Sequence, residues 1–146
     1  MHNFNVPTPQ ADEIRSLPLF QEIPRSRRAE VALVVDQVTL PAGKVIAREG
    51  ELAHEFFVIV DGFVDVMRDD SIFASLGPGE FFGELGLLSD PHRTATVVAA
   101  TEVDLAVLSR RDFRTLVARF PDFASKVLME ASRRVTADIR MVEAAA

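Results

Sequence analysis

Residues 79–97 read GEFFGELGLLSDPHRTATV and interrupt a series of short β-prone segments. A helical turn that starts near Gly83 would leave its first N–H groups unpaired and pointing outward, where an anion can bind. Arg93 supplies a planar countercharge for phosphate oxygens, and the hydroxyl of Thr94 can donate to the same group. Glu84 can accept from a sugar hydroxyl. The stretch therefore indicates a ligand that carries both a phosphate and a hydroxyl on a small scaffold.

A plainer interpretation of the same residues stays open at this point. Glu84 and Arg93 could form an ion pair that brackets a loop, and Gly83 could serve a turn, since glycine adopts positive φ without steric cost. Spacing alone does not separate the two interpretations.

The sequence on either side of this stretch predicts the fold. Between Gln37 and Ser109, short β-prone runs alternate with turn residues about every ten positions. The runs are Val38–Leu40, Val45–Ile46, Phe56–Val60, Val64–Val66, Ile72–Leu76, Thr96–Ala99 and Val103–Leu108. Seven or eight short strands at this spacing predict an antiparallel sandwich or jelly-roll β-barrel.

Helical spacing of apolar residues flanks this β region on both sides. Residues 1–12 predict a loosely held arm, and 13–36 predict two short helices that pack on the barrel. After Ser109, a first helix ends at Pro121 and a last one runs from Asp122 to about Val142. The apolar stripe of the last helix comprises Phe123, Val127, Leu128, Ala131 and Val135. This stripe could be core, a lid over the barrel, or the seam of a homodimer.

Composition limits the classes of function. The chain has 146 residues, no cysteine and a formal charge of −6, so we expect one domain in the cytoplasm and no direct binding of nucleic acid. The N-terminus does not resemble a signal peptide, and no run of residues is apolar enough to span a membrane. The three histidines of the chain, His2, His54 and His92, lie far apart in the sequence and do not form the clustered ligands of a metal site. We therefore expect neither a metal centre nor an enzyme.

Further motifs, in chain order, resemble the cyclic nucleotide-binding domains of catabolite-activator-type regulators, cyclic nucleotide-dependent kinases and cyclic nucleotide-gated channels. The resemblance covers about residues 15–135. Its most specific part is the phosphate-binding cassette, here Phe82–Leu88 followed by Arg93–Val97. The other matching segments are Pro18–Phe20, Pro41–Ile46, Arg48–Glu51, Phe57–Val66 and Leu76–Gly79. Gly86 and His92 depart from the residues most frequent in the family, but neither change removes a ligand group.

The resemblance implies a domain over 13–146, with a cassette at 82–95, a barrel at 37–109 and a hinge helix and lid helix within 110–146. It implies that Arg93 binds a cyclic phosphate and that Glu84 binds the ribose 2′-hydroxyl. Phe82, Gly83, Leu85, Thr94 and Ala95 would line this site, and Val66, Ala74 and Leu76 would contact a purine. The last three would be ordinary barrel-core residues otherwise.

In channel-type members of the family, an arginine on the last helix covers the base. Counting from Pro121, the matching residue is Arg134, although Arg133 is adjacent and a solvated basic stripe is the alternative. If Arg134 and Val135 contact the base only in a closed state, ligand binding would move the segment from about Arg110 to Val142.

We therefore expect a sensor of cAMP, favoured over cGMP, that acts on an unidentified effector protein. The alternative is a degenerate domain that keeps the fold as a protein-interaction module. A transcription factor of this family would need a DNA-binding domain after Ala146, so a free-standing sensor or the regulatory part of a channel, kinase or other effector is favoured.

Overall fold

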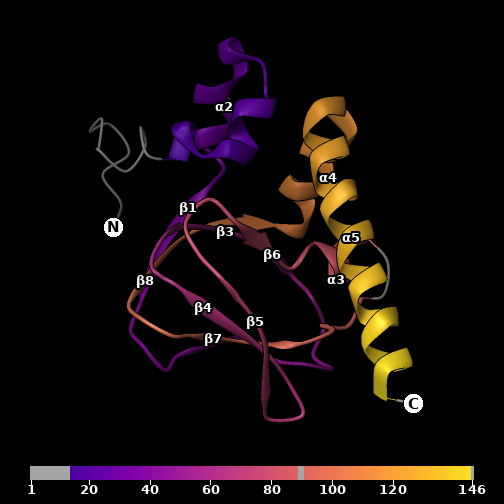
Figure 1. Ribbon diagram of the computed structural model, residues 1–146. Coiled ribbons are helices and arrows are strands. Elements are labelled where there is room, and N and C mark those ends of the chain that lie inside the picture. Colours follow the sequence, from indigo (N-terminus) through magenta and orange to yellow (C-terminus); the bar gives the residue numbers. More distant parts are fainter. Residues whose placement is uncertain (1–13, 89–90, 146) are drawn as a thin grey trace.

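The computed structural model describes residues 14–88 and 91–145, with side chains described except at 85–86 and 137–145. The predicted arm at 1–12 lies outside these ranges. Within them, eight strands form two antiparallel four-stranded sheets, as expected for a jelly-roll barrel (Figure 1). One sheet has the order β1 (Asp36–Leu40), β8 (Val103–Ser109), β3 (Glu55–Asp61), β6 (Phe81–Phe82). The other has the order β2 (Val45–Ala47), β7 (Thr96–Ala99), β4 (Val64–Arg68), β5 (Ser71–Leu76).

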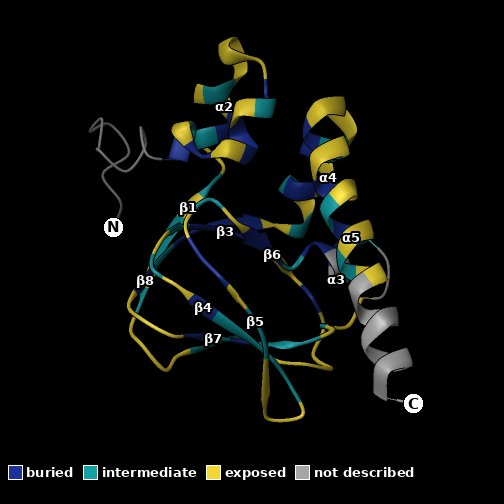
Figure 2. Ribbon diagram, viewed as in Figure 1, coloured by how far each residue is buried: buried dark blue, intermediate teal, exposed yellow. Residues whose placement is uncertain are grey.

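The central strands β3 and β8 are buried on both faces, which explains their nearly continuous apolar sequences. In β3, Phe57 and Ile59 face a barrel cluster between the two sheets. Phe56 and Val58 face a helix-side cluster under the helices. Figure 2 shows β3 as dark blue, with exposed residues on the outer surfaces of the helices and at the turns of the barrel. This sheet is thus the middle layer between the helices and the second sheet.

The N-terminal helices are shorter than the sequence predicts. Residues 14–16 are helical, followed by η1 (Pro18–Glu22), η2 (Arg25–Arg27) and α2 (Arg28–Ala32). The predicted helix extends to Asp36, but Asp36 begins β1 and pairs with Val107 of β8. Strand pairing therefore overrides the helical pattern there. The prediction that these segments pack on the barrel is confirmed, because Leu19, Phe20, Ile23 and Val31 are buried in the helix-side cluster.

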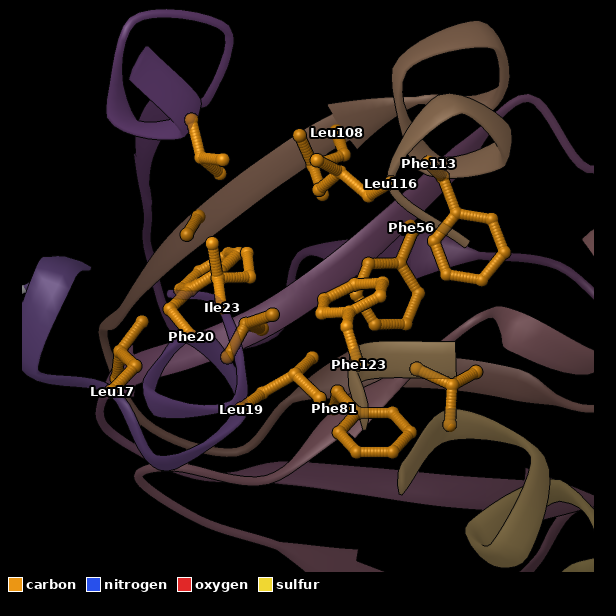
Figure 3. Packing of buried hydrophobic residues seen from close by; sticks show 14 of the residues in the cluster. Leu17, Leu19, Phe20, Ile23, Phe56, Phe81, Leu108, Phe113, Leu116 and Phe123 are labelled. Carbon is orange, nitrogen blue, oxygen red and sulfur yellow. The ribbon is translucent and has the colours of Figure 1, made fainter. Parts of the chain in front are cut away.

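The C-terminal part forms α4 (Arg110–Arg119) and α5 (Pro121–Ala145). Ser109 caps α4 by accepting a hydrogen bond from the Asp112 backbone N–H at 3.1 Å. Pro121 begins α5 rather than lying between the helices, which suits a residue that lacks an N–H. Aromatic rings join the helices to the sheet: Phe56 lies 4.5 Å from Phe113 and Phe113 lies 6.3 Å from Phe123, between ring centroids (Figure 3).

The apolar stripe predicted on α5 divides into two sets. Phe123, Val127 and Ala131 are buried in or against the core, whereas Leu128 and Val135 are 52% and 46% exposed. The core interpretation is thus right for the first set and wrong for the second. Within the described ranges, no helix combines the length and apolar content needed to cross a membrane.

Candidate functional site

The cassette is a helix inserted between two strands of opposite sheets. β6 ends at Phe82, Gly83 follows, and α3 (Glu84–Leu88) starts at once, as the sequence predicts. Residues 91–93 then run antiparallel to the loop at 50–53. The Arg93 N–H donates to the Glu51 carbonyl at 2.7 Å, and the Gly50 N–H donates to the Arg93 carbonyl at 2.9 Å. The backbone of Arg93 is therefore held from both sides.

The side chain of Arg93 is directed at the start of α3. Its Nη1 donates to the Gly83 carbonyl at 3.3 Å, and its Nη2 donates to the Glu55 carbonyl at 2.8 Å. The guanidinium lies 5.6 Å from the centroid of the Phe57 ring. Burial is the main cause that lowers the pKa of Arg93; the charge of Glu55 opposes the shift, and that of Arg110 adds to it. The structure thus brings together Gly83 and Arg93.

Gly83 has a specific structural reason to be glycine. Its φ is +96°, a conformation that L side chains rarely adopt. An added Cβ would lie 2.7 Å from Arg93 Nη1 and 3.1 Å from the Glu55 carbonyl oxygen. The guanidinium of Arg93 therefore occupies the space that a side chain at position 83 would need.

Glu84 is buried and contacts the C-terminal helix. It is 1% exposed, and its carboxylate forms an ion pair with Nη1 of Arg134, fifty positions along the chain. Arg134 Nη2 also donates to the Phe81 carbonyl at 2.5 Å, and the guanidinium lies 5.3 Å from the Phe81 ring centroid. Through these contacts α5 is attached to both β6 and α3.

Arg134 and its neighbour Arg133 differ sharply in environment. The Arg134 side chain is 19% exposed, whereas that of Arg133 is 67% exposed and pairs with Glu130 of the same helix. The solvated-stripe interpretation is therefore wrong for Arg134 and fits Arg133. Burial lowers the pKa of Arg134 to about 10, opposed by the charge of Glu80. Arg134 consequently keeps its positive charge at neutral pH.

The residues predicted to contact a purine lie on the inner face of the second sheet. Val66 of β4 pairs with Ala74 of β5, and both are half-buried. Leu76 is buried in the barrel cluster, and so is Phe82, whose ring stacks on Phe57 at 4.8 Å between centroids. Leu76 and Phe82 therefore have a clear packing role besides any contact with a ligand.

The remaining predicted residues lie where the cassette ends. Thr94 is exposed, Ala95 is half-buried, and the side chain of Leu85 lies outside the described residues. The Thr94 carbonyl accepts a hydrogen bond from Arg68 Nε at 3.1 Å. Arg68 is not among the residues predicted from the sequence, although strand alternation from Val66 could have placed it on the same face. Glu55 is not among them either, because it acts through its backbone carbonyl and so leaves no signal in the sequence.

Among the described residues, no group of three or more histidine, cysteine, aspartate or glutamate side chains could hold a metal ion. The fold and the site together define a two-sheet barrel domain in which a half-buried arginine contacts a turn that begins at a glycine, and a C-terminal helix contacts the same turn.

A family model described as "Cyclic nucleotide-binding domain" matches residues 37–120. A cyclic nucleotide-gated potassium channel of Rhizobium etli is 39% identical over 83% of this chain and 34% of its own length. A cAMP-dependent protein kinase regulatory subunit of Aspergillus niger is 31% identical over 82% of this chain and 29% of its own length. The chain belongs to the cyclic nucleotide-binding domain family.

Solved structures agree with this assignment. The catabolite activator protein of Thermus thermophilus matches with a TM-score of 0.74 and 30% identity, over 85% of this chain and 61% of that one. The regulatory domain of Toxoplasma gondii PKA, solved with cAMP, matches with a TM-score of 0.71 and 25% identity, over 82% of this chain and 48% of that one. The chain spans about a third of the length of the curated relatives that it matches.

Proposed function

We propose that this domain is a non-catalytic sensor that binds cAMP in preference to cGMP and that the bound nucleotide repositions α4 and α5. The preference for cAMP rests on its relatives: the Aspergillus niger protein is named for cAMP, and the Toxoplasma gondii domain was solved with it. A regulatory role fits the same relatives, which are channels and regulatory subunits by name.

The roles of the residues follow from the chemistry of each group. Arg93 would bind the cyclic phosphate with a two-pronged contact, assisted by Thr94. Glu84 would accept from the ribose 2′-hydroxyl, with Gly83, Leu85 and Ala95 around it. The purine would lie against Val66, Ala74 and Leu76 and be covered by Arg134.

The observation that carries the proposal is the contact of Arg134 with Glu84. The carboxylate proposed to bind the ribose is the one that α5 contacts. A nucleotide that binds Glu84 must therefore share that carboxylate with Arg134 or displace Arg134 from it. A ligand shifts a conformational equilibrium only by its difference in affinity for the two states. Arg134 is placed where such a difference would arise.

The proposal is tested by calorimetric titration of the chain with cAMP and with cGMP. Arg93→Ala serves as the binding-deficient variant, and Arg114→Ala, which removes an exposed arginine of α4, serves as its control. Binding that persists in the control and is lost in Arg93→Ala would support the proposal. Absence of heat with either nucleotide, from a protein that circular dichroism shows to be folded, would favour the protein-interaction module instead.

The proposed partners are an effector protein and a second copy of the chain. Leu128 and Val135 are exposed on α5 and lie seven positions apart, hence along one stripe of the helix beside the buried Val127, and the exposed Met129 adjoins Leu128. An apolar helix face of this kind suits a homodimer seam. We propose that the domain acts in the cytoplasm, which suits a chain without cysteine.

A further inference from the structure

We infer that Arg68 is a specificity-determining residue that raises the affinity for purines with an oxygen at position 6, and hence the ratio of cGMP to cAMP affinity. The inference rests on the proposed function, because it names a further residue of the same nucleotide site. It concerns the ratio of the two affinities, whichever nucleotide binds more tightly.

Arg68 connects the β4–β5 hairpin to the cassette. Arg68 is the last residue of β4, and its Nε–H donates to the carbonyl of Thr94, next to Arg93. Its guanidinium lies 4.9 Å from the centroid of the Phe73 ring. One end of the side chain is thus fixed to the cassette, and its plane is held near β5.

The register of the β4–β5 hairpin gives the face on which Arg68 lies. Val66 pairs with Ala74 but Met67 pairs with Ile72, so Phe73 is an extra residue in a β-bulge. Side chains alternate along a strand, so Arg68 shares a face with Val66. That face packs on the barrel cluster and is the one proposed to contact the purine. Arg68 therefore follows the purine-contacting residues directly, at the end of the strand.

The hydrogen-bond donors of the guanidinium determine which purine binds more tightly at this position. Arginine has five N–H donors and no acceptor, in a planar fork. The O6 and N7 atoms of guanine form a matching pair of acceptors, whereas adenine offers N7 beside an amino donor. Stacking on Phe73 restricts the plane in which the fork can lie. A donor group in this position therefore favours a 6-oxo purine over a 6-amino purine.

The test compares three ligands on matched variants. Dissociation constants are measured by calorimetry for cAMP, cGMP and cyclic inosine monophosphate, which has the 6-oxo group of guanine but lacks its 2-amino group. The proteins are the unaltered chain, Arg68→Ala, Arg68→Lys and, as a control for the loss of a surface arginine, Arg111→Ala. Thermal unfolding by circular dichroism verifies that each variant is folded.

We expect Arg68→Ala to weaken binding of cGMP and of the inosine nucleotide by about tenfold or more, while cAMP binding changes by less than about threefold. Arg68→Lys should show the same change in ratio, because an ammonium lacks the planar fork. Arg111→Ala should change none of the three. If Arg68→Ala is unfolded, the Arg68→Lys ratio alone decides the outcome.

An equal loss of affinity for all three ligands would overturn the inference, since Arg68 would then act only by holding the Thr94 carbonyl. Unchanged affinities would overturn it as well. Failure of the unaltered, folded chain to bind any of the three nucleotides would instead overturn the proposed function, and this inference with it. The failure of the inference and that of the function are thus distinguished.

Discussion

At the scale of single residues, the site depends on a glycine and an arginine that occupy each other's space. Gly83 and Arg93 are ten positions apart, and the missing side chain of the first makes room for the guanidinium of the second. The sequence motif predicts both residues for contact with the ligand. That the glycine also accommodates the arginine is visible only in the structure.

Gly83→Ala should therefore lower both stability and ligand affinity. The positive φ makes the free energy of unfolding fall by about 1–3 kcal/mol, and the new Cβ displaces the guanidinium of Arg93. Gly43→Ala is a matched control, because Gly43 also has a positive φ, +87°, but an added Cβ there would meet no atom within 4 Å. Urea unfolding and calorimetry should show a similar loss of stability in both variants and a loss of cAMP affinity in Gly83→Ala alone. Equal affinities in the two variants would contradict this account.

The pair formed by Glu84 and Arg134 can be measured by a double-mutant cycle. Since Glu84 is buried, Glu84→Gln, Arg134→Gln and the double variant should give a coupling energy of about 1–3 kcal/mol in unfolding experiments. Arg133→Gln, at an exposed pair, should cost less than about 1 kcal/mol. Strictly additive effects of the two substitutions would refute a direct interaction.

The pH dependence of this pair follows from the lowered pKa of Arg134. A cation whose pKa is lower in the folded state loses its proton there first, so its burial lowers stability fully below a pKa of about 10. This cost is relieved only as the pH rises above that value towards the ordinary pKa of an arginine side chain. The coupling energy should therefore be the same at about pH 6 and about pH 9, measured by urea unfolding in each buffer.

At the scale of elements, α5 has two functions along its length. Its first three turns carry Phe123 and Val127, which belong to the helix-side cluster, and the buried Ala131. Arg134 lies one turn further on and contacts the cassette. The sequence predicts this helix and its apolar stripe, but not which part is core, because that depends on where the barrel surface ends beneath it.

Truncation can separate the two functions. A chain that ends at Ser132 keeps the buried residues of α5 and loses Arg134, so it should fold and bind cAMP at least about fivefold more weakly. A chain that ends at Pro121 also loses Phe123 and Val127, and cavities of that size cost several kcal/mol each, so it should not fold. Far-UV circular dichroism is the suitable probe of folding, since the chain has no Trp and no Tyr. Tighter binding by the Ser132 chain would show that Arg134 competes with the nucleotide rather than covering it.

The limits of sequence-based prediction are clearest at the boundaries of elements. The strands of the barrel follow from β-prone runs between turn residues, and α3 follows from the break at Gly83. The helix expected up to Asp36 ends at Ala32, because pairing of Asp36 with Val107, seventy-one positions later, is a tertiary effect. Likewise, Arg93 and Glu84 are identified by a motif, whereas the partner of Glu84 on α5 depends on how two distant elements pack.

At the scale of the whole molecule, the exposed face of α5 predicts self-association. Sedimentation velocity should detect a homodimer, and the double change Leu128→Glu with Val135→Glu should convert it to a monomer. Leu33→Glu is the control, because Leu33 is 81% exposed and lies at the end of α2, away from this face. A chain that is monomeric at all accessible concentrations would rule out the dimer.

Because β3 is buried on both faces, substitutions on one face can be made separately from substitutions on the other. Alternate residues of this one strand belong to separate packing clusters, Phe57 and Ile59 to the barrel cluster, Phe56 and Val58 to the helix-side cluster. Substitutions under the helices can therefore change how α4 and α5 are seated without altering the neighbours of Phe57 beside Arg93. In a sensor of the proposed kind, the barrel half of the site could thus be kept while the seating of α5, and with it the position of Arg134, is retuned from beneath the helix.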